Sequence, residues 1–142
     1  MMNPNNHNES VVLRQILRDL ASSFVSANGV SLKIAYEIGG QLIETSTIAL
    51  DLRLGMVAVK SEDDILGLVM SDIYPKGEYV ARLVANRILR SFQQINSLGA
   101  TRFLGQLRSA NDIEASSLLL PLYGVGPKFV ENYCLLAGIK LP

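Results

Sequence analysis

The alternation of hydrophobic and polar positions over the first two thirds of the chain predicts two helices with four strands between them. The first helix begins at Ser10, whose side chain can cap it, and apolar residues then recur at helical spacing. Residues 30–38 alternate strictly between apolar and polar side chains, which predicts a strand with one buried face. Gly39-Gly40 predicts a hairpin turn, because glycine adopts the positive φ angles that such turns need. A return strand over residues 41–48 follows.

Two further strands and a long helix complete this part. A helix through residues 30–48 is the alternative, although the alternation and the double glycine argue against it. We expect a third strand over residues 52–60 and, after a polar turn, a continuously apolar fourth strand over residues 65–70. An amphipathic helix then runs over residues 77–95. The arginines off its apolar stripe, which we expect to face solvent, are Arg82, Arg87 and Arg90.

The pattern changes near Gly99, which breaks the long helix. The elements expected after it are helices over residues 100–107, 113–120 and 129–137, with a turn over residues 121–127. Asn111 or Asp112 can cap the second of these helices, and Gly138 ends the last one. The predicted organisation is a disordered Asn-rich tail (residues 1–9), an α+β domain (residues 10–96) and a helical subdomain (residues 97–142).

The predicted fold class is α+β, with an antiparallel meander sheet flanked by the N-terminal helix and the long helix, followed by a small helical appendage. The hairpin over residues 29–47 and the segment 66–75 make residues 10–96 resemble the roadblock, longin and profilin-like group of small domains. The chain departs from that group at residues 49–51, which leave no room for the helix that those domains usually carry between their second and third strands. The resemblance implies a protein-binding platform, often a homodimer, with a small GTPase or a subunit of a complex as partner. The alternative is a scaffold that only carries the C-terminal motif.

Residues 122–138 carry the most specific motif in the chain, Gly124-Val125-Gly126 between two predicted helices. The two glycines allow a tight turn whose backbone N–H groups point outward at the start of the last helix, where the helix dipole favours an anion. Val125 can lie between the two helices, and Lys128 can meet a phosphate. The motif resembles the helix-hairpin-helix of DNA repair and recombination proteins, which implies contact with a DNA backbone without sequence reading.

Several interpretations of this motif stay open. Hairpins of this kind also serve packing or protein contacts. The residues after Leu98 carry only a small excess of positive charge, which would bind a nucleic-acid backbone weakly. Tyr123 can stack on a base or cap the small core. Lys128 stands where bifunctional DNA glycosylases of this class place a Schiff-base lysine, but those enzymes also need an aspartate well downstream, which the sequence does not have. We therefore expect a protein that is not an enzyme.

Composition narrows the classes of function further. The 13 Lys and Arg residues balance the 13 Asp and Glu residues, so a strongly basic nucleic-acid-binding protein is not indicated. With one cysteine, Cys134, and one histidine, His7, the chain lacks the residues for a cysteine metal site or a Ser-His-Asp triad, and we expect no cofactor. The adjacent carboxylates Glu62, Asp63 and Asp64 are interpreted as a solvated turn rather than a cation site.

Targeting and hydropathy complete the prediction. The N-terminus lacks the features of a signal peptide and the apolar runs are too short to span a bilayer, so we expect a cytoplasmic protein without a membrane span. Hydrophobic residues make up 49% of the chain, a surplus that fits a homodimer or another protein interface. The leading hypothesis is a non-enzymatic adaptor or regulatory module that binds proteins. The alternative is sequence-nonspecific DNA binding through Tyr123, Gly124, Val125, Gly126 and Lys128.

Overall fold

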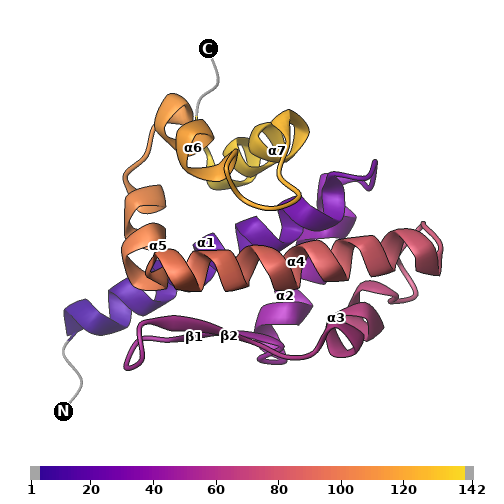
Figure 1. The fold of residues 1–142 in the computed structure, drawn as a ribbon, viewed down its shortest axis with the longest axis horizontal. Helices are drawn as coiled ribbons and strands as arrows, with labels where there is room; N and C mark the ends of the chain where they lie inside the picture. Colours follow the sequence, from indigo (N-terminus) through magenta and orange to yellow (C-terminus); the bar gives the residue numbers. More distant parts are fainter. Residues whose placement is uncertain (1–3, 140–142) are drawn as a thin grey trace.

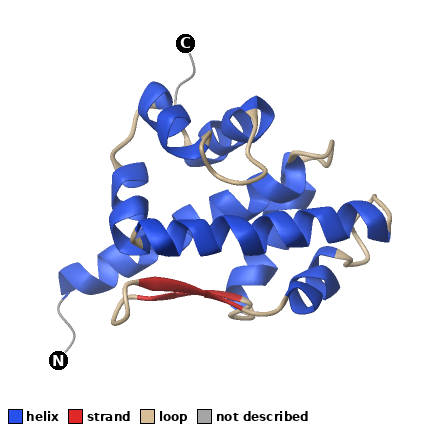
Figure 2. Ribbon diagram, in the orientation of Figure 1, coloured by secondary structure: helices blue, strands red, loops and turns tan. Residues whose placement is uncertain are grey.

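The computed structural model describes residues 4–139, which form seven helices and one two-stranded antiparallel sheet (Figure 1, Figure 2). The element bounds are α1 Pro4–Ser26, α2 Leu32–Glu44, β1 Ile48–Asp51, β2 Met56–Val59, α3 Glu62–Val69, α4 Glu78–Leu98, α5 Ala100–Arg108, α6 Asp112–Leu119 and α7 Pro127–Ala137. The long helices α1 and α4 run through the middle of the molecule, with the sheet and α3 on one side and α6 and α7 on the other (Figure 1). Within the described residues, no helix has the length and apolar character needed to cross a membrane.

Helix α1 is the centre of the fold, and α2, α4, α5 and α7 all pack against it. Its residues from Asp19 to Ser26 are buried on every side. The serines in this stretch tolerate burial because each hydroxyl donates a hydrogen bond to a main-chain carbonyl three or four residues earlier. The predicted first helix is confirmed, but it begins at Pro4 rather than after a Ser10 cap. Residues 4–9 of the predicted Asn-rich tail belong to α1, and residues 1–3 lie outside the described part.

Helix α2 replaces the hairpin that the alternation predicts, so the first two strands of the predicted meander are wrong. Ser31 caps α2, since its side chain accepts a hydrogen bond from the backbone N–H of Ile34. The apolar positions also fit a helical period, because the fully buried Ala35, Ile38 and Leu42 recur every three or four residues. The apolar positions therefore fit the period of a strand as well as that of a helix, and packing against α1 favours the helix.

Gly39 and Gly40 do not turn the chain; they allow α2 to cross α1 closely. A Cβ at Gly39 would overlap the hydroxyl of Ser22 and lie 3.1 Å from the carbonyl oxygen of Arg18. A Cβ at Gly40 would lie 2.6 Å from Nη2 of Arg18, whose guanidinium donates hydrogen bonds to the carbonyl of Tyr36. Glycine is therefore used here for close approach of two helices rather than for positive φ.

Strands β1 and β2 form an antiparallel hairpin in which Ile48 lies opposite Val59. The buried side chains of Ile48 and Val57 face the helices, with β1 against α1 and α2 and β2 against α4 and α5. Asn96 of α4 binds the outer edge of β2, because its side-chain amide accepts a hydrogen bond from the Val57 N–H at 2.8 Å and donates one to the Val57 carbonyl at 2.9 Å. The third predicted strand is confirmed only over Met56–Val59.

Helix α3 stands where a fourth strand is predicted over residues 65–70, so that strand is wrong. Ser61 caps the helix by accepting a hydrogen bond from the Asp64 N–H, and the carboxylates of the first turn are favoured by the helix dipole. The apolar run buries only Ile65, Leu66 and Val69, which share one face. The class of helices with an antiparallel sheet is thus confirmed in outline, while the four-stranded meander is not formed.

The elements after residue 77 agree with the sequence prediction to within a few residues. Asn111 caps α6, and Gly138 ends α7 in the left-handed conformation. Buried residues on both sides of the predicted boundary belong to one core, in which the rings of Phe24 and Phe129 lie 4.5 Å apart between centroids. The independent folding of residues 97–142 stays a prediction.

Candidate functional site

The glycine motif lies in a turn over residues 120–126, which connects α6 to α7 (Figure 1). Asn111 and Glu114 form a capping box at the start of α6, in which each side chain accepts a hydrogen bond from the other residue's N–H. Leu122 is buried below the turn, and its carbonyl accepts a hydrogen bond from the Val125 N–H at 3.2 Å. These contacts anchor the base of the turn and leave its tip exposed.

The two glycines of the turn differ in what the fold requires of them. Gly124 has a φ of +74°, in the left-handed region that favours glycine, and a Cβ there would lie 2.7 Å from Cγ of Arg87. Gly126 has an extended backbone with φ of −126°, and a Cβ there would meet no atom within 4 Å. The conformation and packing therefore require glycine at position 124 and not at position 126, where glycine leaves open space.

The N-terminus of α7 presents unpaired donors beside that open space. Gly126 is the N-cap residue and offers no side-chain hydrogen bond, and Pro127 occupies the start of the helix. The backbone N–H groups of Lys128 and Phe129 lie in the first turn, where a helix supplies no acceptor. The helix dipole adds partial positive charge at this end, so the position favours an anion.

A polar stripe of α4 lies against the turn, and sequence reasoning missed its role. Gln94 holds the turn, since its side chain accepts a hydrogen bond from the Tyr123 N–H at 2.9 Å and donates one to the Pro121 carbonyl at 3.1 Å. The guanidinium carbon of Arg90 lies 5.0 Å from the ring centroid of Tyr123. Arg87 packs its aliphatic part beside the turn. The spacing of these three α4 residues at i, i+3 and i+7 is the signal that could have revealed a common face.

The structure places the predicted site residues as follows. Tyr123 is 44% exposed beneath Arg90, and Val125 is half-buried against the core. Lys128 is exposed, and its Nζ lies 3.6 Å from a carboxylate oxygen of Glu131. Such an exposed pair contributes little to stability and yields readily to a stronger anion. We use "hairpin surface" below for residues 123–126 together with Lys128, Arg87 and Arg90.

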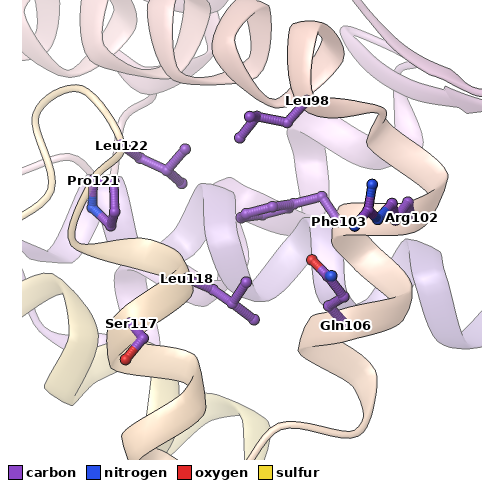
Figure 3. Close-up of a pocket in the computed structure, with 8 residues that line it drawn as sticks. All are labelled: Leu98, Arg102, Phe103, Gln106, Ser117, Leu118, Pro121 and Leu122. Atoms are coloured by element: carbon purple, nitrogen blue, oxygen red, sulfur yellow. The ribbon is translucent and has the colours of Figure 1, made fainter.

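An apolar cleft of about 340 Å³ lies on another side of the same region, between α5 and α6 (Figure 3). The side chains of Phe103, Leu118 and Leu122 point toward its centre in Figure 3, with Leu98 across from them. Arg102 and Gln106 provide the polar part of the lining. A cleft of this kind suits an apolar side chain of another protein, and Leu98 at its rim is 56% exposed.

The described residues offer no cluster of side chains for a metal ion. No group of three His, Cys, Asp or Glu side chains within residues 4–139 could hold a metal ion. Asp63 of the acidic cluster lies 3.7 Å from Arg82 in an exposed ion pair. Burial raises the pKa of the Cys134 thiol, which keeps it in the unreactive protonated form.

Comparison with known proteins adds no family to these observations. No family model, no curated protein and no solved structure matches this chain. The two segments on which the resemblance to roadblock and longin domains rests contain the helices α2 and α3 instead of the expected strands. The resemblance of residues 122–138 to a helix-hairpin-helix stays a prediction.

Proposed function

We propose that this protein binds the sugar-phosphate backbone of nucleic acid through the hairpin surface, without reading sequence and without catalysis. The observation that carries the proposal is Gly126. Its conformation suits any residue and its surroundings would accept a side chain, so glycine there keeps the α7 N-terminus open. Open backbone donors at a helix N-terminus are a site for a phosphate group.

The charges around the turn support the same ligand. Arg87 and Arg90 of α4 lie beside the turn, and Lys128 begins α7. These cations come from two segments far apart in the sequence, which explains how a chain with no net charge can carry a local basic site. Tyr123 adds an exposed aromatic ring, which favours a single strand whose bases can stack.

The strength of this binding is expected to depend steeply on salt. If the ligand meets all three cations of the hairpin surface, affinity for a duplex should fall about 40-fold between roughly 50 and 200 mM salt. Replacing Lys128 by glutamate removes one of them and should reduce that fall to about 12-fold, besides weakening binding at low salt.

The test is fluorescence anisotropy with labelled single- and double-stranded DNA at both salt concentrations. Lys128→Glu and Gly126→Asp should lose most of the binding, because one inverts a charge and the other places a carboxylate at the anion position. Gly126→Ala controls for the backbone, and Lys33→Glu controls for net charge, since Lys33 is exposed on α2. Absence of binding by the wild type at 50 mM salt would refute the proposal, as would equal loss in Lys33→Glu and Lys128→Glu.

A second candidate is protein binding, including a homodimer, and the cleft between α5 and α6 favours it. Leu98 lines the cleft and is 56% exposed, and Leu120, which precedes the lining residue Pro121, is 44% exposed. Together they leave apolar surface in contact with water. Association through it would be insensitive to salt. Light scattering after size-exclusion chromatography at both salt concentrations tests this, and Leu98→Asp should abolish any dimer. A salt-independent monomer at high concentration would refute the dimer.

A further inference from the structure

A second cavity, of about 400 Å³, lies between α1, the end of α5 and α7, and is not part of the hairpin surface. Most of its lining is apolar, including Ile16 of α1, Leu107 of α5 and Ala137 of α7. Its volume is within the range of small-molecule sites, and its walls come from three helices that the common core holds in place. Such a cavity can enclose the apolar body of a small ligand.

Asp19 lines this cavity and is almost completely buried, with 2% of the residue exposed. Within the described residues it accepts one side-chain hydrogen bond, from Nε2 of Gln15 at 2.9 Å, and forms no ion pair. Burying a charged carboxylate without a cation is unfavourable, because the group loses its hydration and no ion pair replaces it. Burial accordingly raises the pKa of Asp19 to about 6.

The other charged and titratable groups around Asp19 do not neutralise it. The guanidinium of Arg18, the preceding residue on α1, donates hydrogen bonds to the Tyr36 carbonyl and lies 3.7 Å from the Tyr36 ring. It forms no ion pair with Asp19, and its charge offsets only part of the effect of burial on the Asp19 pKa. Arg108 lines the cavity from α5 but is exposed and makes no ion pair with Asp19. Tyr133 of α7 is buried, and burial and the Asp19 charge raise its pKa, so it stays a neutral hydroxyl.

We propose that this cavity binds a small apolar amine, whose ammonium group pairs with the Asp19 carboxylate while its hydrocarbon part fills the apolar walls. An ammonium supplies the missing cation and hydrogen-bond donors, and the surrounding low dielectric makes the pair stronger than it is in water. An acid or a phosphate is disfavoured, because it would bring a second negative charge to Asp19. The site is separate from the hairpin surface, so the two proposals stand or fall independently.

The experiment is a titration of the ¹⁵N-labelled full chain with 2-phenylethylamine at about pH 7.5, followed by ¹H–¹⁵N correlation spectra. The neutral isostere 2-phenylethanol serves as a matched probe. We expect saturable shifts at cavity residues such as Gln15, Leu107 and Ala137, with the amine bound at least tenfold more tightly than the alcohol. Asp19→Asn should remove this preference, whereas Asp72→Asn, which changes an exposed carboxylate of equal charge, should keep it.

Two further variants make the result decisive. Ala137→Leu fills the cavity and should weaken both probes, while Lys128→Glu should bind them like the wild type, since it affects only the hairpin surface. The proposal is overturned if millimolar amine gives no saturable shifts at the cavity, or if Asp19→Asn binds amine and alcohol as the wild type does.

Discussion

The crossing of α1 and α2 at Gly39 can be tested by adding a single methyl group. In Gly39→Ala the new Cβ would overlap the Ser22 hydroxyl, which donates a hydrogen bond to the Arg18 carbonyl at 2.6 Å. It would also lie 3.1 Å from two main-chain atoms of α1, the Arg18 carbonyl oxygen and the Ser22 nitrogen. The hydroxyl can rotate away, but the backbone atoms can move only if the two helices separate.

The magnitude follows from opposing contributions. Replacing glycine by alanine inside a helix stabilises the folded state by about 1 kcal/mol. Overpacking a helix interface costs about 1–3 kcal/mol, and losing the Ser22 hydrogen bond costs about 1 kcal/mol more. We therefore expect Gly39→Ala to lower the free energy of unfolding by roughly 1–3 kcal/mol.

The control is Gly67→Ala, which makes the same chemical change in α3 at a position where a Cβ meets nothing within 4 Å. It should be more stable than the wild type by about 1 kcal/mol. The free energy of unfolding of Gly40→Ala should lie between those of Gly39→Ala and Gly67→Ala, because its Cβ displaces only the flexible end of Arg18. Urea denaturation followed by circular dichroism measures all three free energies of unfolding. Equal stabilisation by Gly39→Ala and Gly67→Ala would refute the close crossing of α1 and α2 at Gly39.

Three further predictions concern the core and the sheet. Asp19→Asn should be more stable than the wild type by about 2 kcal/mol at pH 8, allowing for water in the cavity. The sign follows because the folded-state pKa of Asp19, about 6, lies above its ordinary value of 3.8. The charged carboxylate therefore lowers the free energy of unfolding of the wild type above pH 6, and this destabilisation disappears as the pH falls from 6 toward 4. A difference that grows below pH 5 in urea denaturation would contradict this. Phe129→Ala should cost about 3–5 kcal/mol, because it empties the position beside Phe24; a loss below 1 kcal/mol would show that the C-terminal helices fold apart from α1. Asn96→Ala should lower the free energy of unfolding by about 1–3 kcal/mol, because it leaves the N–H and the carbonyl of Val57 without their hydrogen-bond partner. Hydrogen exchange at the Val57 amide should accelerate, while exchange in α7 should not change.

The sequence predicts the C-terminal elements well because their boundaries carry local signals. Asn111 with Glu114 three residues later is a capping box, and Gly138 has the left-handed conformation expected after a helix. Such signals act through hydrogen bonds between residues close in the chain, so they do not depend on distant packing. The long helix α4 is predicted for a related reason, since its apolar stripe is long enough to fix one period.

The segment from residue 30 to residue 70 is predicted wrongly where local patterns fit two structures. Alternation over residues 30–38 is genuine, yet Ala35 and Ile38 fit a helical face as well, and only the contact with α1 favours that face. The start of α3 was open to prediction, because Ser61 followed by three acidic residues is a helix N-terminus as much as a polar turn. The role of Arg87 and Arg90 in the hairpin surface depends on tertiary packing of α4 against the turn, which no local pattern contains.

In the glycine motif, the structure separates the glycine that the fold requires from the glycine on which the proposed binding of nucleic acid depends. Gly124 is required by its backbone conformation and by the Arg87 side chain, so loss of nucleic-acid binding in a Gly124 variant would not distinguish misfolding from a damaged site. Gly126 has neither requirement, and a Gly126 variant with unchanged stability reports on the ligand position alone. The sequence motif treats the two glycines alike. Because their structural requirements differ, Gly126 is the position at which binding and folding can be measured independently.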